Sequence, residues 1–313
     1  MAPRVGVLNE KTASGRPKPD VRTVARLVEL GWWATPEAAE AALTRLNNSN
    51  GARFAYETAG PAIDWLLETL GEGEHRSSKR SCAAQAVFKF PLILTHSTSA
   101  LQAGWEMVVQ PRGVGGLGLS LEVARRHVAS YAQVLVYSKE FMEKRASLLE
   151  KLGVPDGRAA IAYHFHLLGS SEITLHNGAE WMQSQRLDVV RMVSAHPGLL
   201  WRSPEGLSPK LDFLRTVVGL DTSEIASPFL TYSLKDRIRP RYLYALQRGV
   251  EQRYTFGSLV IPSDVNFLKM VNSLAKGTHA TAEGVAAYKA HIATPAFRAY
   301  MDEQEAAIRA GRR

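Results

Sequence analysis

The stretch HPGLLWRSPEGLSPKLDFLRTVVG, residues 196–219, decides the fold of this chain. Ser203 stands directly before Pro204 and Glu205, an order that suits a helix N-cap, a proline at the first helical position and an acid in the first turn. Sixteen residues after the serine comes Gly219, a residue type that readily takes the left-handed conformation at a helix end. The stretch therefore predicts one serine-capped helix that ends at a glycine.

The same arrangement recurs along the chain. A leucine stands three residues before a serine in five segments, at intervals of 41, 33, 32 and 30 residues. The segments are FPLILTHS (90–97), YAQVLVYS (131–138), HFHLLGSS (164–171), HPGLLWRS (196–203) and ASPFLTYS (226–233). Glycines that we interpret as helix C-caps stand at positions 71, 113, 153, 219 and 249. Because the intervening apolar residues have helical spacing, the pattern predicts an all-α solenoid with repeats of about 30–41 residues.

The glycines of PRGVGGLGLS, residues 111–120, have the spacing of a dinucleotide-binding loop. Such a loop follows a strand, whereas the preceding segment ALQAGWEMVVQP has helical spacing. We interpret Gly113 as the end of a helix, and Gly115, Gly116 and Gly118 as a loose hinge. No nucleotide is expected there, and no other motif indicates a cofactor.

Composition limits the classes of function. The 313 residues are 45% hydrophobic but contain no apolar run near the ~20 residues that cross a bilayer, so we expect no membrane partner. Cys82 is the single cysteine, which excludes an internal disulfide and a cysteine-rich zinc site. His164 and His166 lack a third metal ligand in sequence, and no nucleophile or paired-carboxylate spacing indicates an enzyme. The net charge of +8 favours a polyanionic partner.

Three regions differ in character. Residues 1–20 are basic and lack aromatic side chains, which predicts a disordered arm. Residues 21–272 hold the helical repeats. Residues 273–313 follow as a helical extension, which we expect to form two helices divided at Thr294 and Pro295.

With these repeats in hand, the chain resembles the mTERF family, the mitochondrial transcription termination factor-like proteins of mitochondria and chloroplasts. The segment ASPFLTYSLKDRIRPRYLYALQRG (226–249) resembles a late repeat of plant and algal members, and FGSLVIPSDVNFLKMV (256–271) resembles their closing unit. The resemblance covers roughly residues 50–272. It is weaker over 120–186, where Ala132 and Phe165 stand in place of the expected proline. It implies a curved α-helical superhelix with a basic concave face that binds nucleic acid.

The repeat register also predicts residues that contact a polyanion. Seven or eight residues after the capping serine, three repeats carry a cation: Arg145, Lys210 and Arg241. Equivalent positions of a solenoid form a stripe, and an exposed stripe of cations at repeat spacing suits the phosphates of a duplex. To this stripe we add five neighbouring cations, namely Lys235, Arg237, Arg239, Arg202 and Lys89.

Charge and resemblance together predict a factor that binds double-stranded DNA as a monomer and regulates organellar transcription, for instance its termination. Two alternatives stay open. One is an RNA-binding factor for organellar splicing or RNA processing, and the other is an α-solenoid scaffold for protein partners. The sequence does not distinguish mitochondrion from chloroplast, and it gives no target site.

Overall fold

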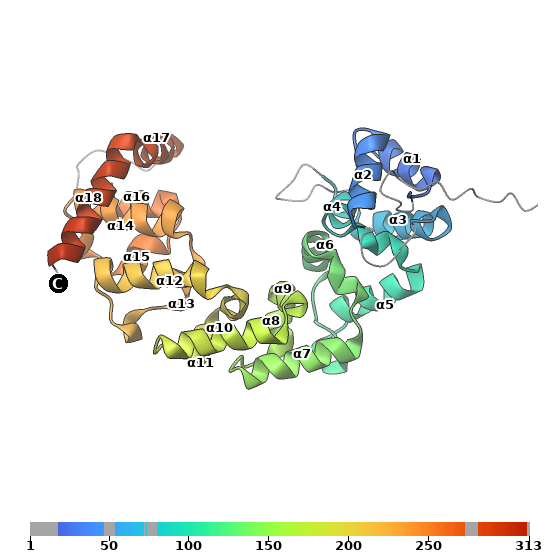
Figure 1. Cartoon of the computed structure of the whole chain (residues 1–313), viewed down its shortest axis with the longest axis horizontal. Helices are drawn as coiled ribbons and strands as arrows, with labels where there is room; N and C mark the ends of the chain where they lie inside the picture. The colour runs from blue at the N-terminus through green and yellow to red at the C-terminus, as the bar shows by residue number, and fades with distance from the viewer. Residues whose placement is uncertain (1–17, 47–53, 72, 74–79, 273–280, 312–313) are drawn as a thin grey trace, which may run out of the picture. The chain divides into compact units, whose positions relative to one another are not determined.

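Helices form the regular structure of the chain (Figure 1). The computed structural model describes residues 18–46, 54–71, 73, 80–272 and 281–311. Within these ranges every regular element is a helix, so the predicted all-α class is confirmed. Most of the predicted basic arm, residues 1–17, lies outside the described residues. The described residues fall into two compact units.

Unit 1 comprises the described residues of Met1–Leu149 and Asp156–Gly169. It begins with α1 (Val21–Glu29), α2 (Pro36–Leu46), α3 (Tyr56–Leu70), α4 (Cys82–Lys89), the 3₁₀ turn η1 (Pro91–Thr95) and α5 (Thr98–Val109). It continues with η2 (Arg112–Val114), α6 (Leu121–Ser130), η3 (Ala132–Val136), α7 (Lys139–Lys151), α8 (Gly157–Tyr163) and α9 (His166–Gly169).

Unit 2 comprises Glu150–Pro155 and the described residues of Ser170–Arg313. Its first elements are α10 (Glu172–Ser184), α11 (Val189–Ala195), η4 (Pro197–Trp201), α12 (Pro204–Phe213), η5 (Leu214–Val218), η6 (Thr222–Glu224) and α13 (Ser227–Thr231). They are followed by η7 (Leu234–Ile238), α14 (Arg239–Gln247), η8 (Glu251–Arg253), α15 (Phe256–Val260), α16 (Asp264–Asn272), α17 (Ala282–Ala293) and α18 (Pro295–Gly311). The division of the extension at Thr294 and Pro295 is where α17 ends and α18 begins.

All five repeat serines cap helices, as predicted. Each side-chain oxygen accepts a hydrogen bond from the backbone N–H three residues later, which satisfies one of the donors that a helix N-terminus leaves open. The capping serines are Ser97, Ser138, Ser171, Ser203 and Ser233.

The turn before the short helix also repeats in four of the five repeats, the exception being Ala226 before α13, with φ of −86° and ψ of 148°. Phe90, Tyr131, His164 and His196 have nearly the same backbone angles, with φ between −145° and −138° and ψ between 67° and 78°. The repeats around Tyr131 and His164 lack the expected proline, yet they make the same turn. The departure from the repeat pattern at 120–186 therefore leaves the local geometry intact.

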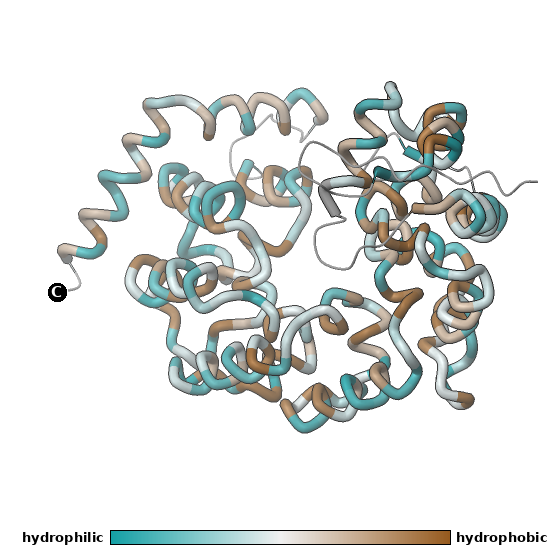
Figure 2. Tube along the Cα trace, turned by 45° about the vertical axis from the view of Figure 1, so that its right-hand side comes forward, coloured by the Kyte–Doolittle hydropathy of each residue, from teal (hydrophilic) through white to brown (hydrophobic). Residues whose placement is uncertain are grey.

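The repeat leucines form the core of both units. Each of them is at most 1% exposed, and they are Leu94, Leu135, Leu168, Leu200 and Leu230. Figure 2 shows apolar and hydrophilic stretches alternating along the helices, as expected where one face of each helix is buried. No helix of the described ranges combines the length and the apolar character that a membrane span requires.

The loop with dinucleotide-type spacing follows helix α5, not a strand. Two details of our interpretation are wrong. The left-handed residue that ends η2 is Gly115, with φ of 97°, and not Gly113. The loop is also no loose hinge, because the N–H groups of Leu117 and Gly118 donate back to carbonyls near the end of α5, at 2.9 and 2.8 Å. A Cβ on Gly116 would overlap the carbonyl of Gln110, so the loop packs closely against its own helix.

Candidate nucleic-acid interface

Arg241 of α14 is 1% exposed and contacts the following repeat. Its guanidinium donates to the carbonyl oxygens of Val260 (3.0 Å) and Pro262 (2.6 Å) and pairs with the carboxylate of Asp264. Val260 ends α15, where a helix leaves carbonyls without intrahelical donors. Partial burial raises the pKa of Asp264, but hydrogen bonds from Arg241 and Lys289 outweigh burial and leave that pKa lowered.

Lys210 of α12 makes the equivalent contact one repeat earlier. Its ammonium donates to the carbonyl oxygen of Leu230 in α13 at 2.8 Å, and the residue is 9% exposed. Burial lowers the pKa of Lys210, and the like charge of Arg202 lowers it further. Within the described residues no ion pair includes this lysine.

Glycines occupy the same register position in two other repeats. Gly104 in α5 and Gly178 in α10 stand seven residues after their capping serines, as Lys210 does. A Cβ on Gly104 would overlap the carbonyl oxygen of Leu135, and a Cβ on Gly178 would overlap that of Leu200. In these repeats the helix backbone itself touches the next short helix, whereas Lys210 bridges to the corresponding carbonyl with its side chain.

The expectation that Arg145, Lys210 and Arg241 line an exposed helical face is wrong. All three are buried. Arg145, 6% exposed, lies over the ring of Phe141 with its guanidinium 5.4 Å from the ring centroid. Lys210 and Arg241 show the physical reason, since their long stems cross apolar surface to open carbonyls of the next repeat. These two cations connect repeats instead of presenting their charged groups to solvent.

Arg237 and Arg239 are engaged as well. Arg237 donates to three carbonyl oxygens at the end of α15 at 2.7–2.9 Å, and its guanidinium lies 4.2 Å from the ring centroid of Tyr232. Arg239 pairs with Asp302 at 2.6 Å and with Glu305 at 2.8 Å, both on α18. Of these two arginines, only Arg239 has its charge balanced by carboxylates.

Arg202, Lys235 and Lys89 keep more of their surface. Lys89 ends α4 in unit 1 and Lys235 lies in η7 of unit 2, and both are exposed. Arg202 is half-buried, with its guanidinium 5.5 Å from the ring centroid of Trp201, which is itself 36% exposed. Four cations and two aromatic residues of unit 2 lie near the capping serines of two successive repeats. We term this set, in which only Lys210 is buried, the cationic edge: Arg202, Lys210, Lys235, Arg237, Trp201 and Tyr232.

The partners that the described residues offer to these cations are uncharged. Among the described residues none of the four pairs with a carboxylate, and the partners of Lys210 and Arg237 are backbone carbonyl oxygens and an aromatic ring. A carbonyl satisfies a donor without cancelling its charge, so a positive potential remains along the edge. Such a surface attracts an anion, and phosphate is the anion that a chain of cations best matches.

The mTERF family model matches residues 106–268, more than half of the chain and the whole cationic edge. The chain belongs to the mTERF family. A search of curated proteins gave no match. Membership implies a nucleic-acid-binding factor related to organellar transcription, in a family whose members are regulators and generally not enzymes. mTERF proteins are typically organellar.

The predicted contact residues included neither aromatic residue of this mTERF edge, Tyr232 and Trp201. Of these two, Trp201 could have been found from the sequence. The signal was present, because the same position of the other repeats carries the smaller Thr95, Val136, Gly169 and Thr231. Elsewhere in the described ranges, no three side chains of His, Cys, Asp or Glu gather as a metal site would require.

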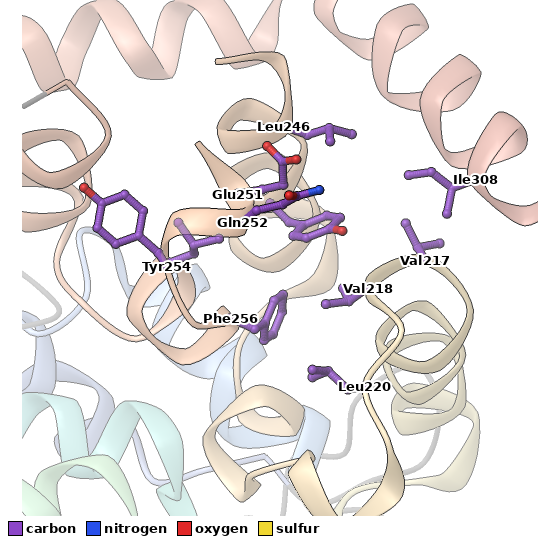
Figure 3. Close-up of a pocket in the computed structure, with 11 residues that line it drawn as sticks. Val217, Val218, Leu220, Leu246, Glu251, Gln252, Tyr254, Phe256 and Ile308 are labelled. Atoms are coloured by element: carbon purple, nitrogen blue, oxygen red, sulfur yellow. The ribbon is translucent and has the colours of Figure 1, made fainter. Parts of the chain in front are cut away.

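A pocket of about 430 Å³ lies in unit 2 of this mTERF protein, between the repeats and helix α18 (Figure 3). Its lining is mixed: apolar Val217, Leu246 and, from α18, Ile308 lie around it together with the polar Glu251 and Gln252. The hydroxyl of Tyr254 points away from it and donates to the carbonyl of Met270 at 3.0 Å. Helix α18 therefore does not pack closely against the repeats along its whole length.

Proposed function

We propose that this protein binds double-stranded DNA in an organelle and regulates transcription there, with termination as its activity. The cationic edge of unit 2 carries the proposal, since it combines cations that lack carboxylate partners with a position inside the matched family region. A duplex presents about one negative charge per 1.7 Å of its axis, a density that the edge suits. The protein acts as a monomer on its site.

The predicted cations divide by role under this proposal. Arg202 and Lys235 contact phosphates directly, and Lys89 does so from unit 1, because Lys89 and Lys235 are exposed and Arg202 is only half-buried. The buried Arg145, Lys210 and Arg241 contribute through their field and through the positions they fix. The other two act together with their partners: Arg237 beside Tyr232, and Arg239 through the rearrangement proposed below.

The test is a titration of duplex DNA at several salt concentrations. Phosphate contacts make the logarithm of the binding constant fall with the logarithm of salt, by about 0.9 per contact. Arg202→Ala with Lys235→Ala should therefore make the slope shallower by about 1.8, and it should weaken all duplexes alike because phosphates carry no base information. The matched control changes two exposed cations away from the edge, Lys269→Ala with Arg298→Ala. Equal slopes for the two variants would contradict the assignment of the edge.

A second candidate function is RNA binding, which the aromatic residues of the edge favour. Trp201 and Tyr232 lie beside Arg202 and Arg237, and a base of a single strand stacks on such rings. If RNA is the ligand, Trp201→Leu should weaken single-stranded RNA binding by about 1–3 kcal/mol. The same change should leave duplex binding nearly intact. Binding to neither nucleic acid would favour a scaffold for protein partners.

A further inference from the structure

Helix α18 supplies carboxylates to an arginine of the repeats. Asp302 and Glu305 both pair with the guanidinium of Arg239, at 2.6 and 2.8 Å. One turn further, Arg309 of α18 pairs with Asp212 of α12 at 2.7 Å and with Glu305 at 2.9 Å. Carboxylates and phosphates both present anionic oxygen atoms that accept hydrogen bonds from a guanidinium. The oxygens of Asp302 and Glu305 therefore occupy positions that phosphate oxygens could take beside Arg239.

The two halves of α18 are held by different forces. Phe297 and Met301 are buried, and Phe297 lies against His291 and Tyr244 with ring centroids 4.9 and 6.3 Å apart. After Met301, no further residue of α18 is buried within the described chain. Ile308 instead borders the pocket described above (Figure 3). The distal half, from Asp302 onward, is therefore attached mainly by ion pairs.

These ion pairs are weak attachments. The side chains that form them are 20–72% exposed, so water and salt screen them. A polyanion competes for the same guanidinium with many charges at once, and its condensed counterions are released on binding. The proximal half keeps its aromatic anchor while this exchange takes place.

We propose that Arg239 is a phosphate site of the nucleic-acid surface, and that the distal half of α18 covers it with Asp302 and Glu305 until a nucleic acid displaces them. The proposal rests on the proposed function. Lys235 and Arg237 lie within four residues of Arg239, so the uncovered guanidinium extends the cationic edge. The acidic pair thereby lowers the affinity for short or weakly charged ligands and leaves a long duplex able to bind.

The experiment compares two charge-matched variants of the full chain. Asp302→Asn with Glu305→Gln removes the cover, and Glu303→Gln with Glu283→Gln removes the same charge from exposed positions of α18 and α17. Duplex DNA is titrated against salt with each protein. The uncovered variant should bind roughly three- to tenfold more tightly than the control, because binding no longer has to break the ion pairs of Arg239 with Asp302 and Glu305. Adding Arg239→Ala to the uncovered variant should abolish the gain.

Amide hydrogen exchange supplies a second measurement on the wild type. Duplex DNA should lower the protection of residues 302–311 and leave that of 295–301 unchanged. The proposed cover of Arg239 would be refuted if the uncovered variant and the control had equal affinities for duplex DNA. It would also be refuted if the gain in affinity persisted after Arg239→Ala. If only the uncovered variant binds, the proposed function stands, but a duplex does not displace the cover and that step of the proposal is overturned. If no protein binds duplex DNA, the proposed function has failed and the cover with it.

Discussion

Replacing Gly178 with alanine tests the repeat contact most directly. Gly178 lies in α10, and a Cβ there would overlap the carbonyl oxygen of Leu200 in the next short helix. The obstacle is backbone that is itself part of the 3₁₀ helix η4, so it cannot rotate out of the way. The two helices must separate, and the close contact between neighbouring repeats is lost.

The size of the effect follows from two opposing contributions. Overpacking of a closely packed contact typically costs about 1–3 kcal/mol, and the rigid neighbour favours the upper end. Alanine is a better helix former than glycine by about 1 kcal/mol, which offsets part of the loss. The free energy of unfolding of unit 2 should therefore fall by about 1–2 kcal/mol.

Gly206 provides the matched control for this prediction. It also lies inside a helix of unit 2, α12, but a Cβ there meets only the side-chain oxygen of Ser203 at 3.5 Å, an ordinary contact. Gly206→Ala should leave stability unchanged or raise it by up to ~1 kcal/mol. Urea unfolding followed by circular dichroism measures both. The reasoning is refuted if Gly178→Ala is as stable as Gly206→Ala.

Two further predictions concern buried cations, and a third concerns a half-buried histidine. Lys210→Met keeps the aliphatic stem but leaves a carbonyl of the next repeat without its donor. The free energy of unfolding, measured with urea, should fall by about 1–3 kcal/mol. An unchanged value would mean that water replaces the ammonium. Arg241→Met removes a guanidinium that is shared by backbone carbonyls and Asp264. The free energy of unfolding should fall by about 3 kcal/mol, more than for Lys210→Met. A smaller loss than for Lys210→Met would argue against the ion pair. Burial lowers the pKa of His196, so the unfolded chain takes up a proton more readily, and stability should fall as the pH drops through about 6.5. The urea midpoint of His196→Gln should fall less than that of the wild type between pH 7.5 and 5.5, and parallel curves would contradict this assignment.

The helical repeats could be predicted from the sequence because their signals are local. A serine cap such as Ser203 and a buried leucine such as Leu200 depend on neighbours within a few residues, and the structure confirms both. Gly113 was misassigned because four glycines stand within residues 113–118, and only the backbone angles identify Gly115 as the left-handed residue that ends η2.

The partners and the exposure of each cation could not be predicted in the same way. Arg239 meets its partners 63 and 66 residues away, and Lys210 meets a carbonyl 20 residues away. Those separations depend on how helices pack, which periodicity does not specify. Charge together with the family resemblance therefore predicted the class of ligand, whereas the exposure of each cation had to come from the structure.

The choice of residue at the shared register position bears on what that position does. A stripe that followed phosphates would need a cation in each repeat that reaches the duplex, and a glycine would interrupt it. Two kinds of residue can contact the carbonyl of the next repeat from this position. A glycine lets the two helices touch, and a long cationic side chain spans a wider gap between them. The chain uses both, with Gly104 and Gly178 at the touching positions and Lys210 and Arg241 at the spanning ones. The smallest and the longest side chains thus share one register position because the helix meets a carbonyl of the next repeat there. In our proposal the direct phosphate contacts are made by other cations, which are more exposed.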